Sequence, residues 1–449
     1  MKEMKGKTVI SVVLFCAGSV IAIAQQKQMS LKDCMEYAVS NSTKMRIRKA
    51  DTDDARLDRR SAILQAFTPS IEGGVYAYYN FGRTIDPQTN TYVNTTSFHN
   101  SYSLSAGISL FNGFEAVNNM KISRTSLNMG ISEEQQAEAD ICLATMEAYY
   151  NAVYYSLLSD SCEEQFRTAQ ESLILVKKQE QLGMKGYADV VQSESDMAKR
   201  QLDYTNARNA KTDALTTLQD LMFWPLDSTL SIVTDINAEY LFDSQDDVDG
   251  IVEYAKTNNP SVRIALGAME NAKLQLNTAK WQTLPSLSLY GGWSTTYFSY
   301  PGGNISTRPF RDQFSNNGGE YVQLSLSIPI YSRLSRLSNI YKRRNAYNRY
   351  NAEYNQKLRD IEAEVRRAVQ DRDGASDAFL QAERYAEVQA EAYKLSRKQY
   401  EQGLISPIEY QTATNQYLSS KADMMNALFK FYIKRGVVEY YSGVRYLDQ

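Results

Sequence analysis

The sequence is internally duplicated, with a repeat unit of about 200 residues, so its fold is expected to contain the same unit twice. The segment CMEYAVSNS, which begins at Cys34, recurs as IVEYAKTNN, which begins at Ile251. Further landmarks keep a nearly constant separation of about 220 residues: Pro69 with Pro285, Leu104 with Leu324, and Gly183 with Gly403. The duplication predicts repeat one at 30–224, a linker at 225–246 and repeat two at 247–443.

Each repeat contains one very long segment without helix breakers. Residues 114–182 and 334–402 contain no Pro, and each segment has a single Gly. As a helix, about 69 residues would extend roughly 100 Å. Apolar side chains step by three and four, the spacing of coiled coils, in two stripes: Leu143, Met146, Tyr150, Val153 and Leu157, and Tyr385, Val388, Ala392 and Leu395. Such narrow stripes bury little in one helix, so these helices need neighbours.

A shorter helix opens each repeat. In repeat one it is expected from about Ser30 to Ala66, with Ser30 as the N-cap and Asp33 three residues later. Pro69 ends this helix, as Pro285 ends its counterpart, because Pro cannot donate a backbone hydrogen bond.

Four segments alternate between apolar and small polar side chains, and we expect strands at about 69–81, 101–111, 286–297 and 321–331. In the clearest case, apolar and small polar residues lie on opposite faces of one strand. The apolar face has Tyr102, Leu104, Ala106, Ile108 and Leu110, and the small polar face has Ser101, Ser103, Ser105, Gly107 and Ser109. Such strands fit a half-buried sheet in a soluble protein or a transmembrane barrel. In a barrel, 83–97 and 299–317 would be extracellular loops, and these residues would supply interfacial aromatics: Tyr76, Tyr78, Tyr79, Tyr290, Trp293, Tyr297 and Tyr300.

The first 24 residues are expected to be a secretory signal peptide. Three Lys precede an apolar run, and small residues precede a cleavage site between Ala24 and Gln25. Cys16 follows Phe15, whereas a lipoprotein anchor needs a small residue there, so we do not expect lipidation. The remaining cysteines, Cys34, Cys142 and Cys162, are expected to be small buried hydrophobes.

Composition argues against several classes of function. With 49 Lys plus Arg, 52 Asp plus Glu and a net charge of -3, the chain has no basic surface for nucleic acid. The single histidine, His99, falls in a predicted loop and supports neither a catalytic triad nor a zinc site. We therefore predict no catalytic residue, no metal site and no cofactor, and we do not expect an enzyme.

The sequence resembles the TolC-type outer-membrane factors, the family of outer-membrane efflux proteins. The resemblance covers nearly the whole chain after the signal peptide and rests on three features: the duplicated helix–strand–strand–helix–helix unit, the strand ends at Phe111 and Tyr331, and the helix-turn-helix tips at 181–190 and 400–409. It implies a mixed α/β membrane protein and a homotrimer. Four strands per protomer would form one 12-stranded barrel in outer-membrane lipid, and a helical coiled-coil barrel would cross the periplasm to an adaptor and an inner-membrane pump.

The resemblance also implies roles for residues at the tips. Asp189 and Tyr400 match a latch that holds the tube closed, although Ile405 replaces its basic member. Glu409 and Thr412 match an aperture ring, in which Thr412 is neutral. The turns that would dock on the adaptor contain Gly183, Gly186, Gly403, Ser406 and Pro407. From the residues alone, Asp189 and Glu409 are equally well explained as acids in the first turn of a helix, where they stabilise its N-terminus.

The predicted function is a passive exit duct in the outer membrane of a Gram-negative bacterium, within a tripartite efflux system or a type I secretion system. The alternative is a non-conducting periplasmic coiled-coil scaffold, whose strands would pack on a soluble core. Sequence does not separate a duct for small molecules from one for proteins.

Overall fold

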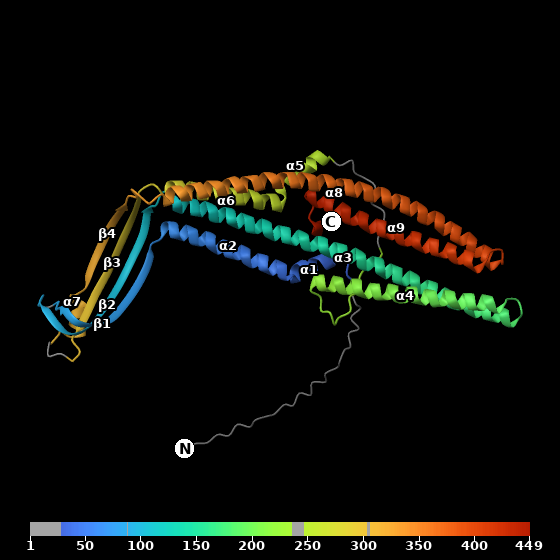
Figure 1. Ribbon diagram of the computed structural model, residues 1–449, viewed down its shortest axis with the longest axis horizontal. Helices are drawn as coiled ribbons and strands as arrows, with labels where there is room; N and C mark the ends of the chain where they lie inside the picture. Colours follow the sequence, from blue (N-terminus) through green and yellow to red (C-terminus); the bar gives the residue numbers. More distant parts are fainter. Residues whose placement is uncertain (1–27, 88, 236–246, 303–305) are drawn as a thin grey trace, which may run out of the picture.

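The structure is a computed structural model that describes residues 28–87, 89–235, 247–302 and 306–449. The predicted signal peptide, its cleavage site and Cys16 lie outside the described residues, as does the second half of the predicted linker. Figure 1 shows a long, narrow molecule with a small sheet at one end and two helical hairpin turns at the other.

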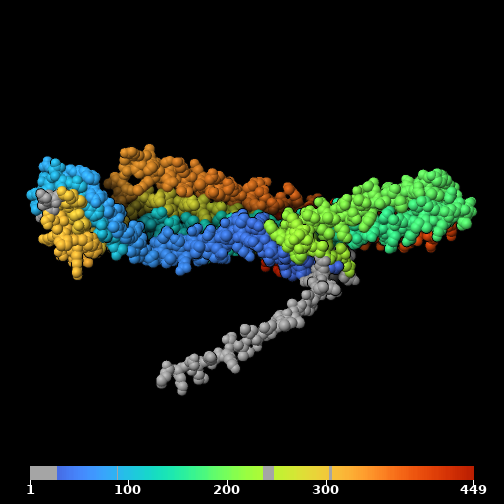
Figure 2. Space-filling model, turned by 90° about the horizontal axis from the view of Figure 1, so that it is seen from below, coloured from blue at the N-terminus to red at the C-terminus, as the bar shows by residue number. Residues whose placement is uncertain are grey.

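The described part of the chain contains these elements: α1 (Leu31–Asn41), α2 (Thr43–Phe67), β1 (Ser70–Ile85), β2 (Tyr92–Phe111), α3 (Glu115–Gln181), α4 (Tyr187–Met222), α5 (Val248–Asn258), α6 (Pro260–Trp281), β3 (Ser286–Ser299), α7 (Phe310–Asn316), β4 (Gly319–Ser327), α8 (Ser335–Glu401), α9 (Pro407–Tyr441) and the 3₁₀ turn η1 (Tyr446–Asp448). Helices α3 and α8 each have 67 residues and so extend about 100 Å. Helix α3 packs along α2, α4 and α6, and α8 packs along α6 and α9. The space-filling view shows these helices as one continuous rod (Figure 2).

The helix that opens repeat one differs from the sequence prediction, because it is broken into α1 and α2 at Ser42. Ser30 caps α1 as predicted, with the Asp33 backbone N–H donating to Ser30 Oγ over 3.2 Å. The counterpart helix breaks at Asn259, which is extended because Pro260 follows it. Repeat one has no Pro at this place. There the side-chain amide of Asn41 donates to the carbonyl of Tyr37 over 2.9 Å and so competes with the helical hydrogen bonds.

The four strands form one antiparallel sheet in the order β1–β2–β3–β4. One face carries the apolar row of β2, and the opposite face carries its serines, as the alternation predicts. Within the described residues, β1 pairs only with β2 and β4 only with β3, so both outer strands keep an open edge. Apolar side chains on the first face stay exposed, for example Val75 at 65% and Val322 at 83%.

The strand ends differ from the expected ones. Strands β1 and β2 continue through most of the expected loop at 83–97 and form a long hairpin. Strand β4 stops at Ser327, and the predicted extension to Tyr331 is wrong for a physical reason. Its partner β3 begins only at Ser286, opposite Ser327, and Pro329 has no N–H to donate.

Helix α7 lies within the second expected loop and covers the outer part of β3, to which β4 does not reach. Its buried residue Gln313 hydrogen-bonds both backbone groups of Phe298: the N–H donates to Oε1 over 3.0 Å, and Nε2 donates to the carbonyl over 2.9 Å. Asn317 Nδ2 donates to the carbonyl of Thr296 over 2.7 Å. Side-chain amides therefore satisfy backbone groups along this part of the β3 edge.

The core consists of several clusters along the rod. The main one lies where α1 meets α3, α4 and α9, and it includes the fully buried residues Cys34, Val153 and Leu218. Burial raises the pKa of the Cys34 and Cys142 thiols to about 12, in keeping with their expected role as buried hydrophobes. The predicted stripe on α8 is not buried within one chain, because Tyr385, Val388 and Leu395 are 48–61% exposed. About half or more of each of these three side chains therefore stays open to solvent in the single chain.

Candidate functional site

The turn between α3 and α4 forms the first of two tips at the far end of the rod (Figure 1). Gly183 has a φ of +70°, a left-handed conformation that favours glycine. Gly186 is the extended N-cap of α4, and its backbone N–H donates to Asp189 Oδ2 over 3.0 Å. In the single chain, Asp189 therefore acts as a capping acid.

The turn between α8 and α9 repeats this geometry. Gly403 has a φ of +73°, and Ser406 is the N-cap, followed by Pro407 at the first helical position. The Ser406 N–H donates to Glu409 Oε2 over 2.8 Å, and the Glu409 N–H donates to Ser406 Oγ over 3.2 Å. Hydrogen bonding from Ser406, first from its backbone N–H and then from its side chain, lowers the pKa of the exposed Glu409 carboxyl below its usual range, so the carboxyl is charged at neutral pH.

The two tips enclose a small cavity of about 60 Å³ that both Asp189 and Tyr400 line. Among the described residues, however, no hydrogen bond joins Asp189 to Tyr400. From the other tip, Lys185 places its Nζ 5.5 Å from the centroid of the Tyr400 ring. Lys185 thus places a positive charge beside Tyr400, although the sequence position matched to the missing basic residue is Ile405.

A second contact joins α4 and α9 about two helical turns beyond Asp189, on the side away from the tips. Gln411 Nε2 of α9 donates to Asp196 Oδ1 of α4 over 2.5 Å. Asp196 also lies 3.5 Å from the guanidinium of Arg200, which is only 5% exposed. An amide and a buried arginine therefore meet one carboxylate between the two coils.

Stacked tyrosines stiffen the α8–α9 hairpin near its tip. The rings of Tyr400 and Tyr410 stack at 4.7 Å and 4°, and Tyr393 continues the stack from Tyr410 to Tyr417. Burial, and then the hydrogen bond with Tyr393, raise the pKa of Tyr410, so its hydroxyl stays protonated. Thr412, the predicted neutral ring position, donates its hydroxyl to the carbonyl of Ile408 over 2.8 Å.

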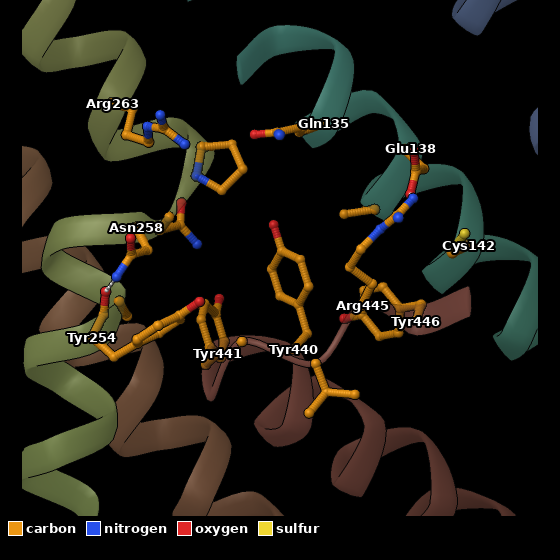
Figure 3. A pocket seen from close by; sticks show the side chains of 16 residues that line it. Gln135, Glu138, Cys142, Tyr254, Asn258, Arg263, Tyr440, Tyr441, Arg445 and Tyr446 are labelled. Carbon is orange, nitrogen blue, oxygen red and sulfur yellow. Dashed lines mark hydrogen bonds and ion pairs between the residues drawn. The ribbon is translucent and has the colours of Figure 1, made fainter. Parts of the chain in front are cut away.

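A larger cavity of about 400 Å³ lies near the middle of the rod, where α3, the α5–α6 junction and the end of α9 meet. Figure 3 shows Tyr440 pointing into its centre, between Arg263 and Arg445. Arg445 forms an ion pair with Glu138 of α3. Burial raises the pKa of Tyr440 to about 12. No sequence pattern signals this cavity, because its walls come from both repeats.

None of the described helices combines the length and apolar character needed to cross a bilayer. No group of three or more His, Cys, Asp or Glu side chains in the described ranges is arranged to hold a metal ion.

The model of one protein family, outer membrane efflux protein, matches residues 38–222 and 251–433. Together these segments make up most of the chain. The chain belongs to the outer membrane efflux protein family. The two matched segments fall one in each predicted repeat, and no curated protein shows significant sequence similarity to this member of the family.

Solved structures of outer membrane proteins share the fold of this member of the family. VceC of Vibrio cholerae has 15% identity and a TM-score of 0.72, covering 93% of this chain and 96% of VceC. The CmeC channel of Campylobacter jejuni has 15% identity and a TM-score of 0.73, covering 93% and 85%. The MtrE channel of Neisseria gonorrhoeae, in an open state, has 15% identity and a TM-score of 0.68, covering 93% and 88%. The predicted mixed fold, with four strands continued by long helices, is confirmed.

One expectation about the sheet of this efflux protein is wrong. Tyr76, Tyr78 and Tyr290 were expected with the interfacial aromatics, yet the pairing places them on the serine face. Trp293 and Tyr297 do lie on the apolar face, against Phe314 and Phe310 of α7. Side chains alternate between the two faces of a strand, so the even-numbered residues of β1 all lie on one face. The pairing with β2 makes this the face that carries the serines.

Proposed function

We propose that this protein is a passive outer-membrane exit duct, formed by three copies of the chain, which serves a tripartite efflux or type I secretion system. In this proposal the three sheets close into one 12-stranded barrel in the outer membrane. The helices continue the barrel as a hollow tube through the periplasm, where an adaptor and an inner-membrane pump engage the tips. The protein itself does no chemistry.

The observation that carries the proposal is the sheet with two open edges and an exposed apolar face. An open strand edge cannot lie in lipid, because its backbone N–H and C=O groups would have no partner. Pairing β4 of one copy with β1 of the next removes every such edge. Residues such as Val75, Leu324 and Leu326, each more than 60% exposed, then contact lipid. The small polar face lines the lumen.

The helices support the same assembly. Tyr385, Val388 and Leu395 of α8 are largely exposed in one chain, as are Ile174 and Leu175 of α3, at 56–57% exposure. A neighbouring coil would bury these side chains and form the wall of the tube. In the periplasmic scaffold alternative, a soluble core would cover the apolar face of the sheet, and the described residues place only the short helix α7 there.

The tips are the proposed gate. Asp189 and Tyr400 line the cavity between the two hairpins of one chain, and Lys185 lies next to Tyr400. We propose that Asp189 and Tyr400 form the latch, and that three copies of Glu409, beside the neutral Thr412, form an anionic aperture ring. The exposed turns around Gly183, Gly186, Gly403, Ser406 and Pro407 are the proposed adaptor contacts.

The deciding experiment is single-channel conductance of detergent-purified protein in planar bilayers, with the oligomer mass measured in the same preparation. We expect a trimer with small, stable steps that multivalent cations reduce. A water-soluble monomer or dimer without conductance would contradict the duct and favour the scaffold.

A further inference from the structure

We infer that the serine face of the sheet carries a binding site for organic cations that contain an aromatic ring. The inference rests on the proposed duct, because it takes this face as the wall of the lumen. The wall of the channel would retain cations of this class as well as let them pass.

Tyrosine rings on this face pack over glycines of neighbouring strands. Tyr290 of β3 pairs directly with Gly107 of β2, and Tyr321 of β4 pairs with Gly292 of β3. A Cβ atom added to Gly107 would lie 2.9 Å from Cδ1 of Tyr290, and one added to Gly292 would lie 2.8 Å from Cε1 of Tyr321. Both distances are too short for a real contact. Any side chain larger than that of glycine at these two positions would therefore collide with the tyrosine ring that covers it.

A third ring is held in the same way within β1. A Cβ atom on Gly74 would lie 3.1 Å from Cε2 of Tyr76, so this ring too folds back over a glycine. The three rings still expose much of their surface: 67% for Tyr76, 44% for Tyr290 and 46% for Tyr321. Their backs are supported by the sheet, and their other surfaces are open to the lumen.

One further aromatic row crosses the sheet nearer its outer end. Tyr78, His99 and Phe298 are direct neighbours across β1, β2 and β3. The rings of Tyr78 and His99 stack at 5.0 Å and 11°, and those of His99 and Phe298 lie 6.3 Å apart at 26°. The chain's single histidine is thus part of an aromatic layer on the strands and does not lie in a loop.

The charge on this face of the sheet favours positively charged ligands. Within the described strands, the serine face carries one acid, Glu72, and no Lys or Arg. The face of an aromatic ring is electrically negative and attracts cations, and the attraction is stronger when part of the hydration shell is lost. An anion would find no cationic partner here, and a small hydrated cation would gain little from the rings. A cation with its own aromatic ring gains from both the charge and the stacking.

The test uses block of the channel current in potassium chloride by benzyltrimethylammonium, which carries a ring and a fixed charge. Tetramethylammonium is the control without a ring, and benzenesulfonate is the control with the opposite charge. We expect benzyltrimethylammonium to block at the lowest concentration. Replacing Tyr76, Tyr290 or Tyr321 by Leu should raise the half-blocking concentration about 2- to 5-fold per ring, whereas Phe at the same positions should preserve the block.

Tyr79→Leu is the matched control, because Tyr79 lies in the same strand on the apolar face, with 54% exposure. Benzyltrimethylammonium should block this variant at the same half-blocking concentration as the wild type. Equal block by benzyltrimethylammonium and tetramethylammonium, or by benzenesulfonate, would overturn the site and leave the duct standing. A preparation that carries no current in potassium chloride alone would overturn the duct, and the site with it.

Discussion

Gln411 and Asp196 lie 215 positions apart in the sequence, yet the amide of Gln411 donates a hydrogen bond to the carboxylate of Asp196 over 2.5 Å. Through this bond α9 of the second repeat holds α4 of the first. Neither residue belongs to a sequence motif. The contact makes the junction between the two hairpins of one chain part of the proposed gate.

The first prediction concerns this contact. Gln411→Leu should increase single-channel conductance, because it removes the bond between the hairpins while leaving Asp196 beside Arg200. Gln416→Leu is the matched control, since Gln416 is an exposed amide on the same helix. If both variants conduct like the wild type, the contact does not restrain the gate.

The second prediction concerns the proposed latch. Asp189→Ala together with Tyr400→Phe should raise conductance in planar bilayers. Since Tyr400 stacks on Tyr410 and lies beside Lys185, Tyr400→Leu should loosen the gate more than Tyr400→Phe, which keeps the ring. Wild-type conductance in all three proteins would show that the latch lies elsewhere.

The third prediction concerns the aperture ring and its pH dependence. Glu409→Gln should weaken block by multivalent cations, whereas Glu401→Gln should not, because Glu401 is already paired with Arg397 over 3.0 Å. The lowered pKa of Glu409 keeps its carboxylate charged as the pH falls to the ordinary value for glutamate, 4.5. Cation block in the wild type should therefore persist from neutral pH to that value and decline only below it. A decline already near pH 6 would exclude Glu409 as the blocking group.

The fourth prediction concerns the edge of β3. Gln313→Leu leaves the N–H and the carbonyl of Phe298 without their side-chain partner, at a cost of about 1–3 kcal/mol. Hydrogen exchange of the Phe298 amide should become faster. The exposed neighbour Asn316, changed to Leu, provides the control. Unchanged exchange in Gln313→Leu would mean that water or another group replaces the amide.

Much of the fold could be predicted because single residues mark its boundaries. Pro69 marks the end of α2, and Gly183 and Gly403 mark the turns after α3 and α8. The break at Ser42 was missed because no Pro accompanies it, although Pro260 marks the same place in the second repeat. Pro329 was a signal for the early end of β4. Helix α7 has only seven residues, too few to show a helical period.

The site was only partly predictable. Asp189 and Glu409 lie close in sequence to the backbone groups that they cap, so local pattern identified them. The contact of Lys185 with Tyr400 and that of Asp196 with Gln411 join different repeats. Their geometry depends on how two long coils pack, and a sequence pattern along one helix carries no information about that.

The unequal strands have a consequence outside the cell. Strand β4 has nine residues, about the number a tilted strand needs to cross the hydrocarbon core, whereas β2 has 20. In the proposed orientation, the surplus length places the hairpin around Tyr92 beyond the lipid headgroups. Three such hairpins would be the first part of the protein that an antibody or a bacteriophage meets. Variation there would change how the bacterium is recognised without touching the gate at the opposite end.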